Sequence, residues 1–267
     1  MGENEKQKKK DILVRAKNVG MAFRKPDEKY DTLKERVINF FKGKKNHSKK
    51  LQVLEGVNFE IEKGESLGVI GHNGAGKSTL LKIVAGIYQP TIGEISSNGK
   101  IMLLNIGAGF DFEASAEENI YLNGAILGFT RKQMKERFDS IIEFSELHDF
   151  MKMPLKNYSS GMISRLGFAI AIDIEPDLLL VDEVLSVGDE NFRKKCVKKI
   201  DELKEKGVSF MFVSHNISQV RKICEKTLWI ENSKVMDYGD TKEVCDKYIK
   251  YCAELAKQSE NNIEKKA

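Results

Sequence analysis

The 267-residue sequence is poor in cysteine and lacks the long apolar stretches of secreted or membrane-spanning chains. Its four cysteines include no C-x-x-C pair and no metal-like grouping with histidine, which favours free thiols in a reducing cytosol. The lysine-rich residues 1–10 lack the apolar region of a secretory signal and are expected to be disordered. No apolar run approaches the length that crosses a bilayer, so we expect a partner to carry out any work within a membrane.

Excess charge of either sign is also small. Lysine and arginine outnumber aspartate and glutamate by 44 to 40, which gives a net charge of +4. This balance suits a protein that binds an anionic nucleotide or lies beneath an anionic membrane, and it demonstrates neither. The composition, 41% hydrophobic and 31% charged, predicts a soluble protein with a substantial core, in one large domain or two small ones.

The clearest motif is GHNGAGKST at residues 71–79, which fits the phosphate-loop pattern G-x-x-x-x-G-K-[ST]. Its glycines let the backbone turn tightly around a polyphosphate, and the following helix adds the positive end of its dipole. We expect Lys77 to reach the β- and γ-phosphates and the Ser78 hydroxyl to bind Mg²⁺. A short apolar strand before the loop and a helix after it argue against a chance glycine turn. The expected nucleotide-binding residues are Gly71, His72, Asn73, Gly74, Ala75, Gly76, Lys77, Ser78 and Thr79.

A second motif, LLLVDE at residues 178–183, indicates a buried strand that ends in two carboxylates. Asp182 falls where α/β sheets place their ligands, and we expect it to hold Mg²⁺ through the ion's water shell. Glu183 is the candidate that polarises the attacking water, because a carboxylate near a metal and phosphates can orient a nucleophile and accept its proton. The alternative is an acidic pair that merely ends a strand, an interpretation that the phosphate loop disfavours.

Strands and helices alternate along most of the chain, which predicts an α/β fold with a mainly parallel sheet covered on both faces. Antiparallel strands near the N-terminus and a helical block at 112–173 are predicted as attachments to this sheet. Two capping boxes mark the block, Ser115 with Glu118 and Thr130 with Gln133. Helices are expected near 116–128, 131–146, 162–173, 190–206, 217–224 and 241–253.

The charged insertion 25–50 separates two of the N-terminal strands. Leu33, Val37, Phe40 and Phe41 fall on one face of a predicted helix, and the insertion ends in the basic run KGKKNHSKK. Two interpretations stay open: a solvated surface loop, or a helix that docks on a membrane or a partner.

A third motif, NYSSGM at residues 157–162, places small residues at a helix start, where Ser159, Ser160 and Gly161 can form an anion site. The S-x-G lies about twenty residues before the acidic strand, and a lone histidine follows a later strand. This order of motifs after a phosphate loop resembles the ABC (ATP-binding cassette) ATPases. The resemblance covers residues 11–253 and leaves 254–267 as a polar tail.

The resemblance implies the ABC form of the phosphate-loop NTPase fold, with a RecA-like core, an antiparallel β subdomain and an inserted α-helical subdomain. It implies that His215 touches the γ-phosphate and that Phe23 stacks on adenine. SVGD at 186–189, which ends in Asp189, matches the family's D-loop. Ser159, Ser160 and Gly161 match its signature, which binds the ATP of a partner subunit.

Two departures from the usual family pattern point to one branch. The signature L-S-G-G-Q is Y-S-S-G-M here, and the glutamine expected before the helical block is missing from LLNIGAGF. Asn105 is the nearest candidate by position for that glutamine's role at Mg²⁺. Together with ENIYLNGAILG and VDEVLSVGDENFRKKC, these stretches look like the branch that exports teichoic acids, O-antigens and capsules.

This likeness implies a homodimeric subunit that binds and hydrolyses ATP with Mg²⁺ and drives integral membrane permease subunits. It would lie peripherally on the cytoplasmic side of the cell membrane and take no nucleic acid. One alternative is a soluble ABC ATPase acting on ribosomes or DNA, although such proteins usually carry two cassettes or a coiled-coil insertion. Another is a nucleotide-binding scaffold without turnover, against which Glu183 and His215 argue.

Overall fold

The computed structural model describes residues 11–24, 50–104, 109–182 and 189–264, with side chains described up to residue 257 except that of Arg24. Several expectations therefore lie outside the described residues: the disorder of residues 1–10, the helix within the 25–50 insertion, the role of Asn105, the position of Glu183 and the D-loop residues 186–188. Within the described ranges, nine strands form one sheet in the order β4-β1-β2-β9-β8-β3-β7-β6-β5.

The centre of the sheet is parallel, as the alternation of strands and helices predicts. β3 lies between β7 and β8 and is parallel to both, and β6 and β5 continue the parallel order beyond β7. The parallel strands are β3 (Ser66–Ile70), β5 (Ile101–Leu104), β6 (Leu178–Asp182), β7 (Ser209–Val213) and β8 (Lys226–Glu231). Because parallel strands end at the same edge, the C-terminal ends of β3, β6 and β7 lie together there.

The other edge of the sheet is largely antiparallel, which agrees with the predicted attachment. β1 pairs with β2 on one side and β4 on the other, and β9 runs antiparallel to β8. These strands are β1 (Ile12–Arg24), β2 (Lys50–Glu62), β4 (Ile92–Ser97) and β9 (Lys234–Asp240).

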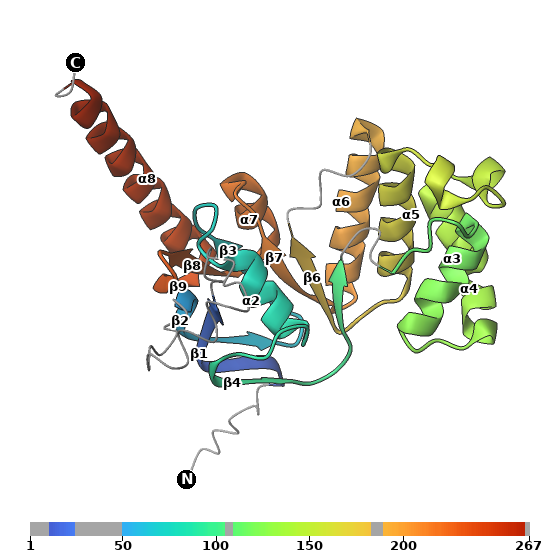
Figure 1. The fold of residues 1–267 in the computed structure, drawn as a ribbon, viewed down its shortest axis with the longest axis horizontal. Helices are drawn as coiled ribbons and strands as arrows, with labels where there is room; N and C mark the ends of the chain where they lie inside the picture. The colour runs from blue at the N-terminus through green and yellow to red at the C-terminus, as the bar shows by residue number, and fades with distance from the viewer. Residues whose placement is uncertain (1–10, 25–49, 105–108, 183–188, 265–267) are drawn as a thin grey trace, which may run out of the picture.

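The helical block follows β5 and lies at the opposite end of the molecule from the C-terminal helix (Figure 1). It contains α3 (Ala116–Ile126), α4 (Arg131–Ser145) and α5 (Ser160–Asp173). Both predicted capping boxes are present: the Ser115 backbone N–H donates to Glu118 at 2.8 Å, and the Thr130 N–H donates to Gln133 at 2.9 Å. These local signals therefore placed the helix starts correctly.

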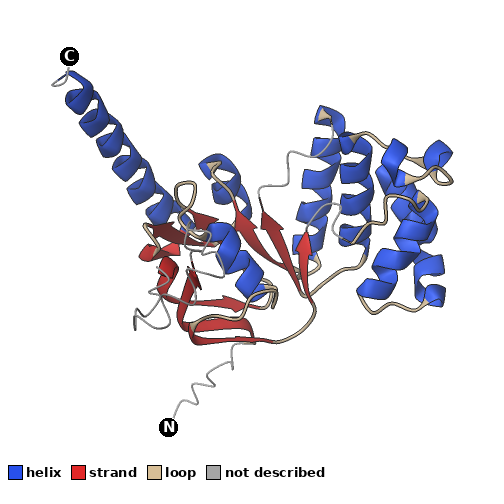
Figure 2. Cartoon of the chain, viewed as in Figure 1, coloured by secondary structure: helices blue, strands red, loops and turns tan. Residues whose placement is uncertain are grey.

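Alternate residues of the central strands enter two apolar cores, one on each face of the sheet. In β6, Leu179 and Val181 belong to the core under the helical block, and Leu178 and Leu180 belong to the core beneath the antiparallel strands. Strand periodicity explains this division, and Figure 2 shows the helices that cover the sheet. The remaining helices are α2 (Lys77–Val84), α6 (Glu190–Glu205), α7 (Ile217–Ile223) and α8 (Thr241–Glu264).

Helix α8 is longer than the sequence suggested. The predicted end near 253 is wrong, since the helix continues to Glu264 and projects from the body of the protein (Figure 1). The polar stretch that was taken as a tail contains no glycine or proline and is rich in residues with good helix propensity, so nothing in it ends the helix. Among the described residues, no helix combines the length and apolar character required to cross a membrane.

Candidate functional site

The phosphate loop joins β3 to α2 and is held by close backbone packing. Gly71, Gly74 and Gly76 all have positive φ, at 143°, 82° and 107°. A Cβ on Gly71 would lie 1.9 Å from the Ile230 carbonyl oxygen, and one on Gly76 would lie 2.6 Å from the Val53 carbonyl oxygen. Side chains at Gly71 and Gly76 would displace the neighbouring strands, so the packing of the chain itself requires these two glycines.

Lys77, at the start of α2, spans the loop. Its ammonium donates hydrogen bonds to the carbonyl oxygens of Gly71, at 2.7 Å, and His72, at 2.9 Å. Burial lowers the pKa of Lys77, while the Asp182 and Glu231 carboxylates act in the opposite direction. Lys77 is the only cationic side chain of the loop motif that faces the cavity. Its ammonium is thus held at the centre of the loop, where it can reach an anion that the loop surrounds.

A cavity of about 190 Å³ opens over the loop, and it brings together residues that are far apart in the sequence. Asp182 at the end of β6 and His215 after β7 line it together with the loop and α2. The remaining lining comes from Val53, Val213, Ser214 and the loop residues Asn73, Gly74, Gly76, Lys77, Ser78 and Thr79. Six of the nine predicted loop residues therefore share one cavity with Asp182 and His215.

The oxygen atoms of Ser78 and Asp182 fit a Mg²⁺ site, because both residues line this cavity and Mg²⁺ prefers oxygen ligands. Within the described part of the chain, no group of three or more histidine, cysteine, aspartate or glutamate side chains could hold a metal alone. A hydroxyl and a carboxylate that share the ion with nucleotide phosphates and water match this chemistry.

The segment after β7 fixes the position of His215. The Asn216 backbone N–H donates to the Ser214 hydroxyl at 3.0 Å, and the Asn216 side chain caps α7 by accepting from Gln219 N–H at 3.2 Å. His215 therefore sits between the end of a buried strand and a capped helix, where its backbone has little freedom.

The turn before α5 forms a second, more open hollow. Ser159 caps α5 by accepting from the Met162 N–H at 3.2 Å. A Cβ on Gly161 would meet only the Ser159 hydroxyl, at 3.8 Å, which is ordinary contact. The hollow is lined by Ser159, Ser160, Gly161, Met162, Ser164, Arg165 and Asp189, and it shares no lining residue with the cavity at the phosphate loop.

Asp189 begins α6 and links it to α5. Its carboxylate accepts from the Phe192 N–H at 2.9 Å and forms an ion pair with Arg165. The Phe192 hydrogen bond and the Arg165 charge hold the pKa of Asp189 below its usual value. Asp189 is thus tied to the hollow at Ser159, while residues 183–188 lie outside the described part of the chain.

Phe23 is not among the residues that line the phosphate-loop cavity. Its ring packs edge-on against Tyr88, with 5.6 Å between ring centroids. Its predicted stacking on adenine stays a prediction.

Sequence reasoning missed Glu231, which lies at the end of β8 and contacts the phosphate loop. Its carboxylate is 2.6 Å from the His72 ring nitrogen Nδ1, across 159 positions of sequence. The available signal was an acidic residue that ends an apolar strand, the same signal that identified Asp182.

Comparisons with known proteins agree with this geometry. The family model described as ABC transporter matches residues 54–186. The O-antigen export system ATP-binding protein RfbB of Klebsiella pneumoniae is 44% identical over 215 residues, 80% of this chain and 85% of that protein. The teichoic acids export ATP-binding protein TagH of Staphylococcus haemolyticus is 40% identical over 248 residues, 93% of this chain and 92% of that protein.

Solved structures confirm the predicted fold. The ATP-binding subunit of an ABC transporter superposes with a TM-score of 0.70 at 21% identity, over 88% of this chain and 93% of that one. A dimeric ATP-binding cassette in a post-hydrolysis state, bound to ADP and Pi, superposes with a TM-score of 0.69 at 21% identity, over 86% and 99%.

Proposed function

The chain belongs to the ABC transporter family of ATP-binding proteins, and from this premise we propose that it binds and hydrolyses ATP to energise export of a cell-surface polysaccharide or teichoic acid. The observation that supports the proposal is that two separate hollows, one at the phosphate loop and one at the start of α5, each lie at the N-terminus of a helix. The names of the two export relatives supply the substrate class and favour export over work on ribosomes or nucleic acid.

In the first step, the phosphate loop binds the triphosphate of ATP. The loop's N–H groups and the N-terminus of α2 face the phosphates, and Lys77 exchanges its bonds to the loop carbonyls for bonds to phosphate oxygens. Ser78 and Asp182 would hold Mg²⁺, which supplies charge neutralisation at the phosphates when it is bound.

In the second step, a water molecule attacks the γ-phosphate. The bond between the γ-phosphorus and the oxygen that bridges it to the β-phosphate breaks, so that ADP and inorganic phosphate are the products. Glu183 directly follows Asp182, so we assign it to orient this water and accept its proton. His215, on the wall of the same cavity, would contact the γ-phosphate. Asp182 is assigned to the metal, which leaves Glu183 as the carboxylate of this motif that can act on water.

The second anion site requires a second copy of the chain. Ser159 and Gly161 line a hollow separate from the phosphate loop, so in one chain they do not add to its cavity. Two copies arranged head to tail would place each hollow over the partner's ATP, and the bound nucleotide would stabilise the dimer. Gly161 fits this role because the chain's own packing does not require a glycine there, whereas close approach of a phosphate does.

An apolar groove beside the helical block is suited to a permease subunit at the cytoplasmic face of the membrane. The groove has a volume of about 440 Å³, and side chains of β5, α3 and α5 line it. Ile87, Ile126 and Leu127 on its wall are 55%, 62% and 40% exposed, which is costly unless a partner covers them. Motion of the dimer would then be transmitted to the membrane subunits through this groove.

Glu183→Gln tests the hydrolytic assignment. Glutamine keeps the shape of the side chain and cannot accept a proton, so we expect ATP binding to survive while turnover falls by about 100-fold or more. The variant should form a persistent dimer with Mg²⁺–ATP on a sizing column. Lys77→Ala is the matched control, because it weakens nucleotide binding itself and should stay monomeric. Near-normal turnover in Glu183→Gln would show that the catalytic assignment is wrong.

A further inference from the structure

The buried carboxylate of Glu231 holds the first turn of the phosphate loop. Glu231 is only 7% exposed, and its Oε2 atom lies 2.6 Å from His72 Nδ1 and 3.4 Å from the His72 backbone nitrogen, which donates to it. A carboxylate that is buried to this degree needs such partners, because its desolvation is costly. The contact therefore constrains both the side chain and the backbone of a loop residue.

The strand that carries Glu231 also supports the loop through its backbone. β8 runs parallel to β3 with Trp229 opposite Ile70, at the point where β3 leads into the loop. The next residues, Gly71 and Ile230, approach so closely that a Cβ on the glycine would lie 1.9 Å from the Ile230 carbonyl oxygen. Movement of residues 70–72 therefore requires movement of the end of β8.

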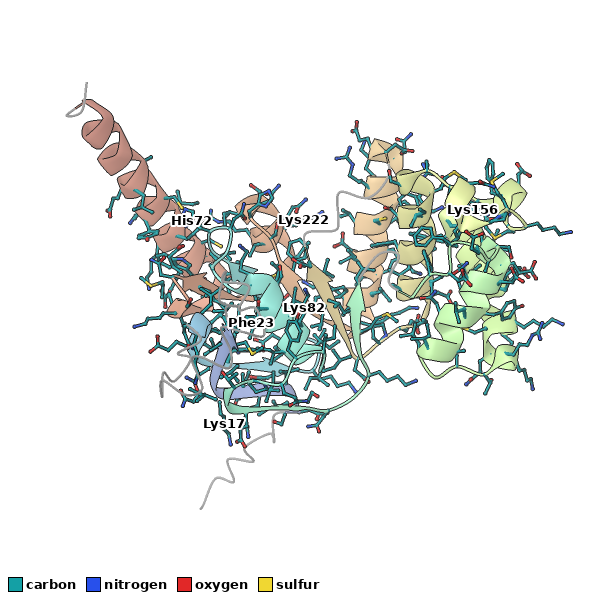
Figure 3. The ribbon with its side chains drawn as sticks, in the orientation of Figure 1. Lys17, Phe23, His72, Lys82, Lys156 and Lys222 are labelled. Carbon is teal, nitrogen blue, oxygen red and sulfur yellow. The ribbon has the colours of Figure 1, made fainter. Side chains whose placement is uncertain are left out.

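Two tyrosines of α8 cover this junction from outside. Tyr248 and Tyr251 contact the Trp229 ring, with centroids 5.5 and 5.0 Å apart, and the His72 ring, at 5.9 and 6.3 Å. Figure 3 shows His72 beside the first turns of α8. The indole N–H of Trp229 is buried and meets no acceptor among the described residues. Packing against neighbouring rings therefore holds the Trp229 side chain in place.

We propose that Glu231 and His72 are positioning residues that couple the phosphate loop to α8, so that nucleotide binding and the packing of Tyr248 and Tyr251 stabilise each other. The inference rests on the proposed binding of ATP at this loop. It differs from the established contacts of a phosphate loop in assigning a role to the C-terminal helix of the same chain.

The physical basis is competition for Lys77. Its ammonium is bonded to the carbonyls of Gly71 and His72, the peptide units that also contact β8. A triphosphate draws the ammonium toward its own oxygens, and the contacts with Glu231 and the hydrogen bond from the Ala75 N–H to the His72 carbonyl are then left to hold the His72 turn. Because coupling free energy is reciprocal, a nucleotide that depends on this contact must also stabilise it.

The chain provides its own probe, since Trp229 is the single tryptophan in the sequence. Mg²⁺–ATP is titrated into the full chain, while tryptophan fluorescence reports on the junction and calorimetry measures the dissociation constant. We expect Glu231→Gln and Tyr251→Leu each to raise the dissociation constant about fivefold to tenfold, within the usual range of coupling between sites. The turnover rate at saturating ATP should change little, so the loss should be seen in KM rather than kcat.

Two matched variants separate coupling from general damage. Glu65 precedes β3, at the end of that strand opposite the loop, and its largely buried carboxylate forms an ion pair with Lys226. Tyr121 stacks on Phe138 in the helical block. Glu65→Gln and Tyr121→Leu should leave ATP affinity unchanged. Tyr251 is partly exposed, so Tyr251→Leu should fold even if Glu231→Gln does not.

The outcomes are distinct. Weaker binding in Glu231→Gln or Tyr251→Leu with normal binding in both controls supports the coupling. Wild-type affinity in every folded variant at the junction, or an equal loss in the controls, overturns it and leaves the proposed function intact. Failure of the wild-type chain to bind ATP would contradict the proposed function and this inference with it.

Discussion

The phosphate loop and the turn before α5 use the same chemistry in opposite settings. Both place glycine and serine at a helix N-terminus, where backbone N–H groups can bind an anion. The loop is wedged between β8 and β2, with hypothetical Cβ contacts of 1.9 and 2.6 Å, whereas a Cβ on Gly161 would meet only one atom, at 3.8 Å. The fold therefore dictates Gly71 and Gly76 of the loop, whereas packing within the chain does not dictate Gly161 of the turn.

The largest expected effect comes from placing alanine in each setting. Gly71→Ala should destabilise the protein by about 3 kcal/mol, because its Cβ collides with a strand carbonyl that cannot easily move. Gly161→Ala should leave stability unchanged or raise it by about 0.5–1 kcal/mol, since alanine is the better helix former. Urea unfolding followed by circular dichroism measures both. An equal loss of unfolding free energy in the two variants would show that the two glycines do not differ in their structural role.

A mixture of two variants, each unable to dimerise alone, tests whether the phosphate loop and the turn before α5 act together across subunits. Lys77→Ala disables the loop, and Gly161→Asp places a carboxylate where the partner's phosphates should approach, so neither chain alone should form an ATP-dependent dimer. In a mixed dimer, the intact loop of one chain faces the intact turn of the other. We therefore expect an ATP-dependent dimer only in the mixture, as measured on a sizing column.

A mixture that stays monomeric, beside a wild-type control that dimerises, would show that the two sites do not act across subunits. The wild-type control also shows whether ATP-dependent dimers form at all under the conditions of the experiment.

The smallest effect concerns Ser159, which caps α5 and also lines the hollow. Ser159→Ala removes the cap and should cost about 1 kcal/mol of stability. Ser159→Asp restores a capping carboxylate and should recover that stability, while its negative charge opposes nucleotide bound by a partner. Thermal unfolding and ATP-dependent dimer formation, measured on both variants, separate the two roles. Equal stability in the two variants would argue that the cap contributes nothing.

Sequence reasoning succeeded where the determining signal is local. The capping boxes at Ser115 and Thr130, the strand into the phosphate loop and the carboxylate that ends β6 are all encoded within a few neighbouring residues. Asp182 and His215 line one cavity, and the rule that parallel strands end at one edge pointed to Asp182, whereas His215 was identified only through the family resemblance.

The contacts that it missed span large sequence separations. Glu231 meets His72 across 159 positions, and no local pattern encodes that pairing. The true end of α8 was missed for another reason: a polar composition was taken as a tail, although polarity alone does not stop a helix. Helix ends without glycine or proline depend on what the helix contacts, which the sequence alone does not state.

The length of α8 gives the contacts at its base a mechanical meaning. At 1.5 Å per residue, its 24 residues extend about 36 Å, and the buried side chains among those described, Thr241, Val244, Cys245 and Tyr248, all lie in its first turns. A helix anchored at one end acts as a lever arm: a tilt of about 10° at the base would displace the far tip by roughly 6 Å. The anchored end includes the two tyrosines that contact His72 and Trp229. Small rearrangements around a bound phosphate would therefore become large displacements at a point well outside the nucleotide site.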